Sequence, residues 1–531
     1  MHPAGGPQPA QDPPRYDLLV IGGGVNGTGI ARDAAGRGLS VLLCEQDDLA
    51  AHTSSASTKL IHGGLRYLED FHFALVRKAL LEREVLLNAA PHIMRPLHFV
   101  MPHDAHLRPM WMIRAGLFLY DHLAPRKRLA ASAEIDLRKH IAGEPLDPRF
   151  QRGFVYSDGW TDDARLVVLN AVDAAARGAV IATRTRCTKI EAASGEWDAT
   201  LEDVGADSRG SAGGSVGSYG YESVPGSGGV GATRSVRARA VVNAAGPWVS
   251  RFITGSSPIR ASHRVRLVKG SHIVVPKLFA HRFAYIFQNE DRRIVFAIPY
   301  EREFTLIGTT DVDYQGEPQD VSIDSTEVDY LCAVANRYFT RHVGPAEVVW
   351  SYSGVRPLVN DEATDPSSVT RDYILELDRE PAPMLSVFGG KITTFRKLAE
   401  TAVDRLTGIL GSNATAWTRD AKLPGGDLPG GSFAVFLRTL ERRYPWLPVA
   451  LRTRYARAYG TRIQQVLGNA DSLRDLGAEL LPQLYEREVE YLCREEFART
   501  AQDILWRRSK LGLHLRGTST RPLEEWLMRG A

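Results

Sequence analysis

Residues Tyr16 to Glu45 contain the feature that most constrains how this chain can fold. Their first part, Leu18 to Ile21, is a continuous apolar run, which is typical of a strand buried on both faces of a parallel sheet. The run leads into a G-x-G-x-x-G pattern in which Gly22 permits a tight turn, Gly24 lets backbone approach a pyrophosphate, and Gly27 allows close packing of the next helix. The pattern predicts a strand, a turn and a helix whose first N–H groups point at phosphates.

The second half of this unit supplies an acidic residue. The helix is expected to end near Gly36 to Gly38, and a second strand, Ser40 to Cys44, places Glu45 about twenty residues after the glycines. A carboxylate at that position can accept both hydrogen bonds of a ribose diol. We expect the unit to bind the ADP half of a dinucleotide; a glycine-rich turn in an ordinary βαβ unit is the alternative.

A second copy of the pattern, Gly226 to Gly231, lies in a Gly/Ser-rich stretch from Gly205 to Ser235. No apolar strand precedes this copy and no acidic residue on a second strand follows it, so we interpret residues 205–235 as a flexible loop. With one convincing fingerprint, the chain lacks a second half for NAD(P)H. The electron donor is therefore expected to be the substrate itself.

Composition restricts the class of protein. With 531 residues, 44% of them hydrophobic and 24% charged, the chain is expected to form about two to three soluble domains. The net charge of +3 is too small for a nucleic-acid-binding protein, so no nucleic-acid partner is expected. The four cysteines are widely spaced and indicate neither a disulfide framework nor a metal site.

No apolar run is long enough to span a bilayer. The best stretch, Met110 to Ala124, is broken by Arg114 and Asp121; we favour a core helix there, with an amphipathic element in a membrane interface as the alternative. Arg126 to Arg128 can touch an anionic lipid surface or form a solvated turn. Residues 1–14 are expected to be a disordered tail without a secretory or mitochondrial targeting signal.

Thr53 to Tyr67 concentrates hydroxyl groups, a lysine, a histidine and paired glycines, which suits phosphate and ring contacts; a serine-rich helix cap is the alternative for its first part. The segment SSASTKLIHGGLRYLE, Ser54 to Glu69, resembles the flavin-proximal segment of aerobic, FAD-dependent glycerol-3-phosphate dehydrogenases. That family belongs to the D-amino-acid-oxidase-like flavoprotein group. The resemblance runs from about Asp17 to Leu515, and it departs only in the Gly/Ser-rich loop, which is longer than the family needs.

Further segments carry the same resemblance: NAAGPW at Asn243–Trp248, KGSH at Lys269–His272, NED at Asn289–Asp291, GTTD at Gly308–Asp311, SGVRP at Ser353–Pro357, TRDY at Thr370–Tyr373 and FGGKITT at Phe388–Thr394. It implies FAD as cofactor. The implied cofactor-binding residues are Gly22, Gly24, Asn26, Gly27, Glu45, Ser54, Ser55, Ser57, Lys59, Leu60, His62, Gly63, Ala245, Gly246, Gly354, Gly390, Lys391 and Thr393.

Gly389 and Gly390 directly precede a helical-looking stretch, Lys391 to Asp404. Such a helix would place its N-terminal N–H groups near a flavin, where negative charge builds on reduction. A capping turn is the alternative for the two glycines.

The resemblance also places six residues around the substrate: Arg66, Tyr67, His272, Arg356, Arg371 and Lys391. Three arginines and a lysine match a phosphate dianion better than a carboxylate, although any one arginine can equally be a surface ion-pair partner. His62 and His272 are the candidate proton acceptors because an imidazole titrates near neutrality; a structural histidine is the alternative for each. His62, His272, Arg356 and Lys391 form the expected catalytic set.

The resemblance implies oxidation of sn-glycerol 3-phosphate to dihydroxyacetone phosphate by hydride transfer to flavin N5, with electrons passed to ubiquinone or menaquinone in the membrane. An amine or amino-acid oxidase of the same fold that uses oxygen is one alternative, and a flavin-binding scaffold without turnover is another. We expect a homodimer in the cytoplasm that attaches peripherally to the anionic inner face of the cell membrane.

The expected fold is α/β, with a Rossmann-like FAD-binding domain, an α+β substrate domain built on a β-sheet, and a C-terminal helical domain. Residues 15–415 form the oxidoreductase, whose FAD-binding part is expected at about 15–90, 151–260 and 350–415 and whose substrate part at about 91–150 and 261–349. Two LPGG repeats, at 423–426 and 428–431, mark a linker. Residues 416–531 show helical periodicity and contain no calcium-binding loop. The mitochondrial version of the family that the chain resembles has a calcium-binding extension, so its absence, together with the missing transit peptide, favours a bacterial type of the enzyme.

Overall fold

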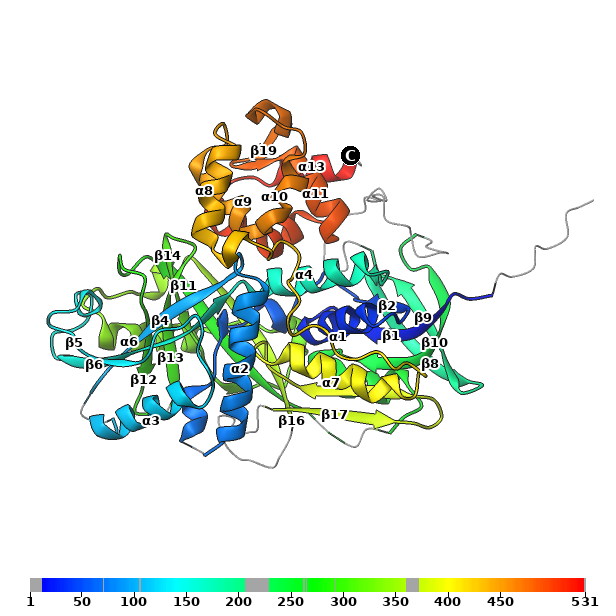
Figure 1. Cartoon of the computed structure of the whole chain (residues 1–531), viewed down its shortest axis with the longest axis horizontal. Coiled ribbons are helices and arrows are strands. Elements are labelled where there is room, and N and C mark those ends of the chain that lie inside the picture. The colour runs from blue at the N-terminus through cyan, green and yellow to red at the C-terminus, as the bar shows by residue number, and fades with distance from the viewer. Residues whose placement is uncertain are drawn as a thin grey trace, which may run out of the picture.

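Two large β-sheets lie side by side in the computed structural model, and a helical C-terminal unit packs against both of them (Figure 1). The structure describes residues 12–69, 71–104, 107–205, 229–260, 263, 265–291, 293–359 and 372–529. Most of the expected tail and of the expected Gly/Ser-rich loop lies outside these residues.

The first sheet is built around the predicted nucleotide-binding unit. Its strands run in the order β17-β18-β10-β1-β2-β7, and a β8–β9 hairpin extends it beside β10. β1, β2, β7, β10 and β18 pair in parallel, which the apolar run Leu18–Ile21 predicts for β1. The bounds are β1 Arg15–Ile21, β2 Val41–Cys44, β7 Val180–Ala182, β8 Thr185–Ala193, β9 Glu196–Asp203, β10 Thr233–Asn243, β17 Tyr373–Asp378 and β18 Met384–Gly389.

Three helices cover one face of this sheet in a row (Figure 1). The central helix, α1 (Val25–Gly36), confirms the predicted helix after the glycines and packs between α4 (Asp163–Ala176) and α7 (Phe395–Thr407). Its small residues permit this close approach: a Cβ atom added at Gly29 would lie 2.8 Å from the Phe395 ring.

The second sheet has ten strands, and long-range antiparallel pairing dominates it. Its order is β15-β11-β14-β13-β12-β4-β6-β3, with β16 beside β11 and β5 beside β6. The bounds are β3 Leu60–Ile61, β4 Met94–Pro102, β5 Ala133–Asp136, β6 Arg152–Thr161, β11 Val265–Pro276, β12 Ala284–Gln288, β13 Ile294–Tyr300, β14 Phe304–Gly308, β15 Val312–Asp313 and β16 Trp350–Val359. α2 (Phe73–Ala89), α3 (Met110–His122), α5 (Val249–Ser256) and α6 (Ser325–Tyr338) complete the main part of the chain.

Three strands of this second sheet fall outside the expected substrate part. β3, β6 and β16 lie within ranges that the sequence assigns to the FAD-binding part, yet they pair with β6, β4 and β11. Strand pairing depends on the backbone that lies alongside, and that partner is remote in the sequence, so composition shifts do not reveal it. As a result, residues 53–61 and 350–359 connect the two sheets.

The C-terminal unit is helical, as predicted, apart from one short hairpin. Its bounds are α8 Phe433–Arg443, α9 Val449–Tyr459, α10 Ile463–Leu467, β19 Glu479–Leu481, β20 Leu484–Tyr485, α11 Glu486–Glu496, α12 Leu511–His514 and α13 Arg521–Arg529, with a π-helical segment at Asp503–Arg508. The apolar stripe from Val489 to Leu505 is buried but does not form one helix. α11 ends where Phe497 adopts a left-handed conformation, and its ring packs into the core of the first sheet.

The structure corrects the preference for a core helix at Met110–Ala124. Leu117 and Tyr120 are buried, but Trp111 is 69% exposed and Phe118 is 60% exposed. α3 lies at the opposite side of the molecule from the C-terminal unit (Figure 1). In the described part of the chain, no helix is long and apolar enough to cross a membrane.

Candidate functional site

The predicted glycine turn borders a cavity of about 540 Å³ at the carboxyl end of β1. Gly22 has φ of +110°, and a Cβ atom at Gly27 would collide with the carbonyl oxygen of Gly22. The residues that line this cavity include Gly22, Gly24, Glu45, Ser54, Ala245 and Gly246. The sequence prediction that the glycines serve a turn and a close helix approach is confirmed by this geometry.

Glu45 lies at the end of β2 with only 9% of its surface exposed. Its Oε2 accepts a hydrogen bond of 2.6 Å from the Gly23 N–H, and its Oε1 accepts one of 2.8 Å from the Asp47 N–H. Burial raises the pKa of this carboxyl group, while the nearby His52 and the two N–H groups oppose that effect. The carboxylate is thus fixed in orientation beside the glycine turn.

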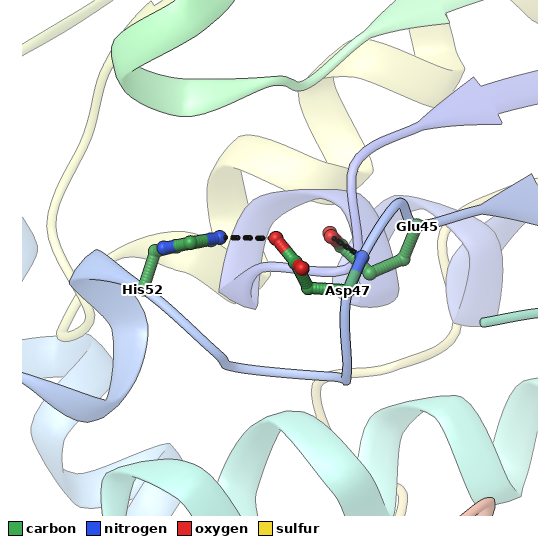
Figure 2. Close-up of side chains that lie close together, drawn as sticks. All are labelled: Glu45, Asp47 and His52. Carbon is green, nitrogen blue, oxygen red and sulfur yellow. Dashed lines mark hydrogen bonds and ion pairs between the residues drawn. The ribbon is translucent and has the colours of Figure 1, made fainter. Parts of the chain in front are cut away.

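Glu45, Asp47 and His52 come together on the loop after β2 (Figure 2). Their candidate ligand atoms lie within 4.8 Å of one another, which is close enough to hold a cation. However, Nε2 of His52 lies 2.7 Å from Oδ2 of Asp47, and Glu45 already receives two N–H groups. These contacts stabilise the loop itself and account for the cluster without a metal.

The start of α1 provides the groups that a pyrophosphate requires. The Val25 N–H donates to Oγ of Ser54 at 3.0 Å, and Nδ2 of Asn26 donates to the Gly389 carbonyl at 3.2 Å. Oδ1 of Asn26 is buried without a hydrogen-bond partner among the described residues. Gly390 leaves this region open, because its Cβ atom would lie 3.0 Å from Asn26. The N-terminus of α1, directly after the glycine turn, fits the phosphate part of a dinucleotide.

Ser57 and Lys59, two of the expected cofactor residues, share one protein partner. Both side chains contact Oδ2 of Asp163 at 2.7 Å, and Lys59 is fully buried over the Tyr352 ring. Burial lowers the pKa of Lys59, and Asp163 opposes that shift. Asp163 therefore holds the side chains of both residues in place. Asp163, at the start of α4, was missed because the sequence analysis did not predict this helix.

Gly389, the last residue of β18, and Gly390 do not lead directly into a helix, which corrects the prediction. Lys391–Thr394 form a turn, and α7 begins four residues later than expected, at Phe395. Gly389 and Gly390 both have positive φ, so they redirect the chain out of the strand. Within the turn, Oγ1 of Thr393 accepts a hydrogen bond of 3.2 Å from the His62 N–H. The turn thus lies against the HGG segment.

The antiparallel pairing of β11 with β16 places Arg356 opposite Val268 and His272 opposite Tyr352. The Arg356 guanidinium forms an ion pair with Asp311 and donates to Oγ1 of Thr309 at 3.0 Å. Gly270 is required here, because a Cβ atom would collide with the guanidinium. Asp311 and Thr309 were not singled out as partners of Arg356, although both lie in the GTTD segment.

His272 is buried, and its Nε2 lies 2.9 Å from Oγ1 of Thr58. Its ring stacks on Tyr352 at a centroid distance of 4.7 Å. Burial lowers the pKa of His272 well below 6.5, and the charges of Arg356 and Lys59 add to the effect. The imidazole is therefore neutral near pH 7.

Lys391 and Tyr67 form a second group, with the ammonium 3.9 Å from the ring centroid. Arg66 precedes Tyr67 in a short 3₁₀ turn, Leu65–Leu68. The segment Thr53–Tyr67 contacts both groups. His272 contacts its Thr58, and Tyr67 follows Thr58 by nine residues. Arg371 lies outside the described residues. The structure thus places His272 against Thr58 and Lys391 against Tyr67, while Arg356 contacts Asp311 and Thr309.

Comparison with known proteins matches two family models. The model described as FAD dependent oxidoreductase matches residues 17–396, and the C-terminal domain of alpha-glycerophosphate oxidase matches residues 416–525. A glycerol-3-phosphate dehydrogenase of Pseudomonas aeruginosa is 53% identical, with 94% of this chain and 92% of the relative covered. A D-erythritol 1-phosphate dehydrogenase of Brucella abortus is 48% identical, with 97% and 98% covered.

A solved structure extends the similarity to the fold. Glycerol-3-phosphate dehydrogenase of Bacillus halodurans, complexed with FAD, aligns with a TM-score of 0.75 and 26% identity. The alignment covers 97% of this chain and 90% of that chain. The similarity therefore includes both sheets and the C-terminal unit.

Proposed function

This chain belongs to the family of FAD-dependent oxidoreductases, and from that premise we propose that it oxidises a phosphorylated polyol, with sn-glycerol 3-phosphate as the first candidate. The observation that carries the proposal is 53% identity, over nearly the whole chain, to a glycerol-3-phosphate dehydrogenase. The product is dihydroxyacetone phosphate. FAD, the cofactor of the family, supplies a hydride acceptor when it is bound.

We assign the FAD site to the glycine turn, Glu45 and the segments around them. Glu45 holds the ribose, because its carboxylate is buried and oriented at the end of β2. Val25, Asn26 and Ser54 face the pyrophosphate. The remaining proposed contacts come from the HGG segment, from Ala245 and Gly246, from Gly354, and from the turn at Gly390–Thr393.

The substrate site is assigned to the cations at the second sheet. Arg356 binds two phosphate oxygens, and Asp311 and Thr309 hold its guanidinium in orientation. Lys391, Arg66 and Arg371 complete the charge that a phosphate dianion requires. His272, which is neutral and beside Arg356, accepts the proton of the substrate hydroxyl. His62 is the second candidate for that role.

A four-carbon polyol phosphate is a second candidate substrate. The 48% identity to a D-erythritol 1-phosphate dehydrogenase covers 97% of this chain, so it is comparable with the similarity to the glycerol-3-phosphate dehydrogenase. Both substrates combine a phosphate with a secondary alcohol. By contrast, the amino-acid oxidases with a similar fold, such as a glycine oxidase at 19% identity, support the fold alone.

We further propose that the electrons pass to a membrane quinone and that the protein attaches peripherally to the inner face of the membrane. α3 supports this attachment, because it presents exposed Trp111 and Phe118 beside Arg108 and Arg114. Aromatic side chains insert at the headgroup level, and arginines bind anionic lipids. The homodimer remains a prediction.

Anaerobic titration of the purified flavoprotein tests the function. Glycerol 3-phosphate is expected to bleach the flavin absorbance within one turnover, whereas glycerol and amino acids leave it unchanged. If D-erythritol 1-phosphate bleaches it at a higher kcat/KM, the four-carbon substrate is the correct one. Bleaching by an amino acid alone would identify an oxidase, and an unchanged spectrum with every substrate would indicate a scaffold.

A further inference from the structure

A buried hydroxyl group contacts the backbone of the HGG segment. Tyr120, on the inner face of α3, accepts a hydrogen bond of 2.8 Å from the Gly63 N–H. The same hydroxyl donates to Asp158, whose two carboxylate oxygens lie 2.8 and 2.9 Å away. Gly63 is one of the expected cofactor residues, so the direction of its N–H group affects the geometry of the expected cofactor site.

Asp158 is in turn held in place from a third element. Nη1 of Arg83, on α2, donates to Oδ1 of Asp158 at 2.5 Å and to the Ser157 carbonyl at 3.0 Å. All these side chains are buried. Burial raises the pKa of Tyr120 well above 10, and the Asp158 charge adds to the effect, so the hydroxyl keeps its proton. The chain of contacts from α2 through β6 to α3 therefore ends on Gly63.

Gly63 lies so close to this network that no side chain fits at its position. A Cβ atom there would collide with Leu80 and lie 2.6 Å from the Tyr120 oxygen. On the other side, the His62 N–H donates to Thr393. Gly64 then turns the chain with φ of +77°, and its carbonyl accepts a hydrogen bond of 3.0 Å from Tyr67. A shift at Gly63 would thus reach Tyr67, whose ring contacts the Lys391 ammonium.

We propose that Tyr120 is a positioning residue, whose hydroxyl fixes the HGG segment and thereby places Arg66 and Tyr67 for the reaction. The inference rests on the proposed function, because it assigns the segment to the flavin and the substrate. Tyr120 acts through Gly63 and through the turn that follows.

The test compares Tyr120→Phe with Tyr156→Phe. Tyr156 is a matched control, since it is buried with its ring 6.1 Å from that of Tyr120, and its change leaves the Gly63 hydrogen bond intact. Both variants are purified with FAD, and their FAD content, melting temperature, visible flavin spectrum, kcat and KM with a soluble dye acceptor are measured. Because small misplacement of reacting groups costs up to about a hundredfold in rate, Tyr120→Phe should lower kcat/KM at least about tenfold.

Tyr120→Phe is also expected to shift the flavin absorption bands while FAD content stays complete, and Tyr156→Phe should match the wild type. A wild-type spectrum and kcat/KM in Tyr120→Phe would overturn the proposal. If that variant does not fold, 3-fluorotyrosine at position 120 keeps the ring and weakens the acceptor; an unchanged rate and spectrum would then overturn it. The spectrum needs no substrate, so failure of the proposed function is recognised separately when the wild type does not oxidise any polyol phosphate.

Discussion

Asp48 and Arg508 form a bidentate ion pair between the loop that follows β2 and the C-terminal unit. Nη1 of Arg508 lies 2.7 Å from Oδ2 of Asp48, and Nη2 lies 2.7 Å from Oδ1. Both side chains are buried, and Arg507 adds a third contact of 2.5 Å to the same carboxylate. Asp48 follows Glu45 by three residues, so the C-terminal unit holds the loop that orients the proposed ribose ligand.

Replacing Asp48 with Asn should destabilise the protein by about 3–5 kcal/mol, because the buried Arg508 loses its carboxylate partner and Arg507 keeps only Asp503. We expect a lower melting temperature and faster loss of FAD on dilution. Differential scanning calorimetry and flavin fluorescence measure the two effects. Glu441→Gln is the control, since Glu441 pairs with Arg452 at an exposed position and should change neither. Unchanged FAD retention in Asp48→Asn would show that the Asp48–Arg508 ion pair does not help to hold the cofactor.

Glu45→Ala should weaken FAD retention, because the ribose loses two charge-assisted hydrogen bonds worth on the order of a few kcal/mol. Equilibrium dialysis of the variant gives the Kd for FAD. Glu45→Gln is the informative companion, as it keeps the shape and one acceptor and should fall between wild type and Glu45→Ala. Full cofactor occupancy of Glu45→Ala in dilute solution would exclude the ribose assignment.

Arg356→Ala should lower kcat/KM for glycerol 3-phosphate by roughly a hundredfold, or about 3 kcal/mol, since a planar guanidinium binds two phosphate oxygens. Arg356→Lys keeps the positive charge beside Asp311 but lacks the planar guanidinium that binds two oxygens, so it should raise the KM for glycerol 3-phosphate. Steady-state kinetics with a dye acceptor gives both values. Glycerol lacks the phosphate and should be an equally poor substrate for wild type and Arg356→Ala. If both substrates slow by the same factor, Arg356 acts on the chemistry or the fold instead.

The exposed face of α3 should be needed for membrane binding. Replacing both Trp111 and Phe118 with glutamate should weaken the free energy of membrane binding by about 1.5–3 kcal/mol per aromatic side chain. The new carboxylates are also repelled by anionic lipids. Co-sedimentation with vesicles of phosphatidylethanolamine and phosphatidylglycerol should decrease, while turnover with a soluble dye stays unchanged. Val449→Glu is the control, because Val449 is similarly exposed but lies on the C-terminal unit. Equal sedimentation of the double variant and the control would rule out α3 as the contact.

Stability should fall as pH decreases below about 6.5, and His92 should account for part of the loss. Burial lowers its pKa to about 3, so the folded state stays neutral while the unfolded state binds a proton below its ordinary pKa of 6.5. The unfolding free energy should therefore drop by roughly 2 kcal/mol between pH 7 and pH 5 on this account. Urea unfolding of His92→Leu at both pH values should show a smaller drop.

His342→Leu provides the control for this experiment, because His342 is exposed and its replacement should leave the pH dependence of the wild type unchanged. The comparison uses the difference between the two pH values, so a constant loss of stability in His92→Leu does not affect it. An equal drop in wild type and His92→Leu would show that other groups carry the pH dependence.

The sequence alone identified the nucleotide-binding unit and its order along the chain. β1, the glycine turn, α1 and Glu45 follow from local rules: an apolar run for a strand buried on both faces, glycine where a turn or a close approach excludes a side chain, and a carboxylate at a fixed spacing. The family resemblance added the segments around Arg356, His272 and Lys391. These conclusions needed no knowledge of which distant residues come together.

Only the tertiary structure determined which residues that are distant in the sequence contact one another. Asp48 meets Arg508 across 460 positions, Lys59 meets Asp163 across 104, and Gly63 meets Tyr120 across 57. It also decided that β6 and β16 join the second sheet, that α7 begins at Phe395, and that α3 turns Trp111 outward. The physical reason is that a buried polar group must find a partner among whatever the fold brings beside it, and that neighbourhood is a property of the packed chain, not of any segment within it.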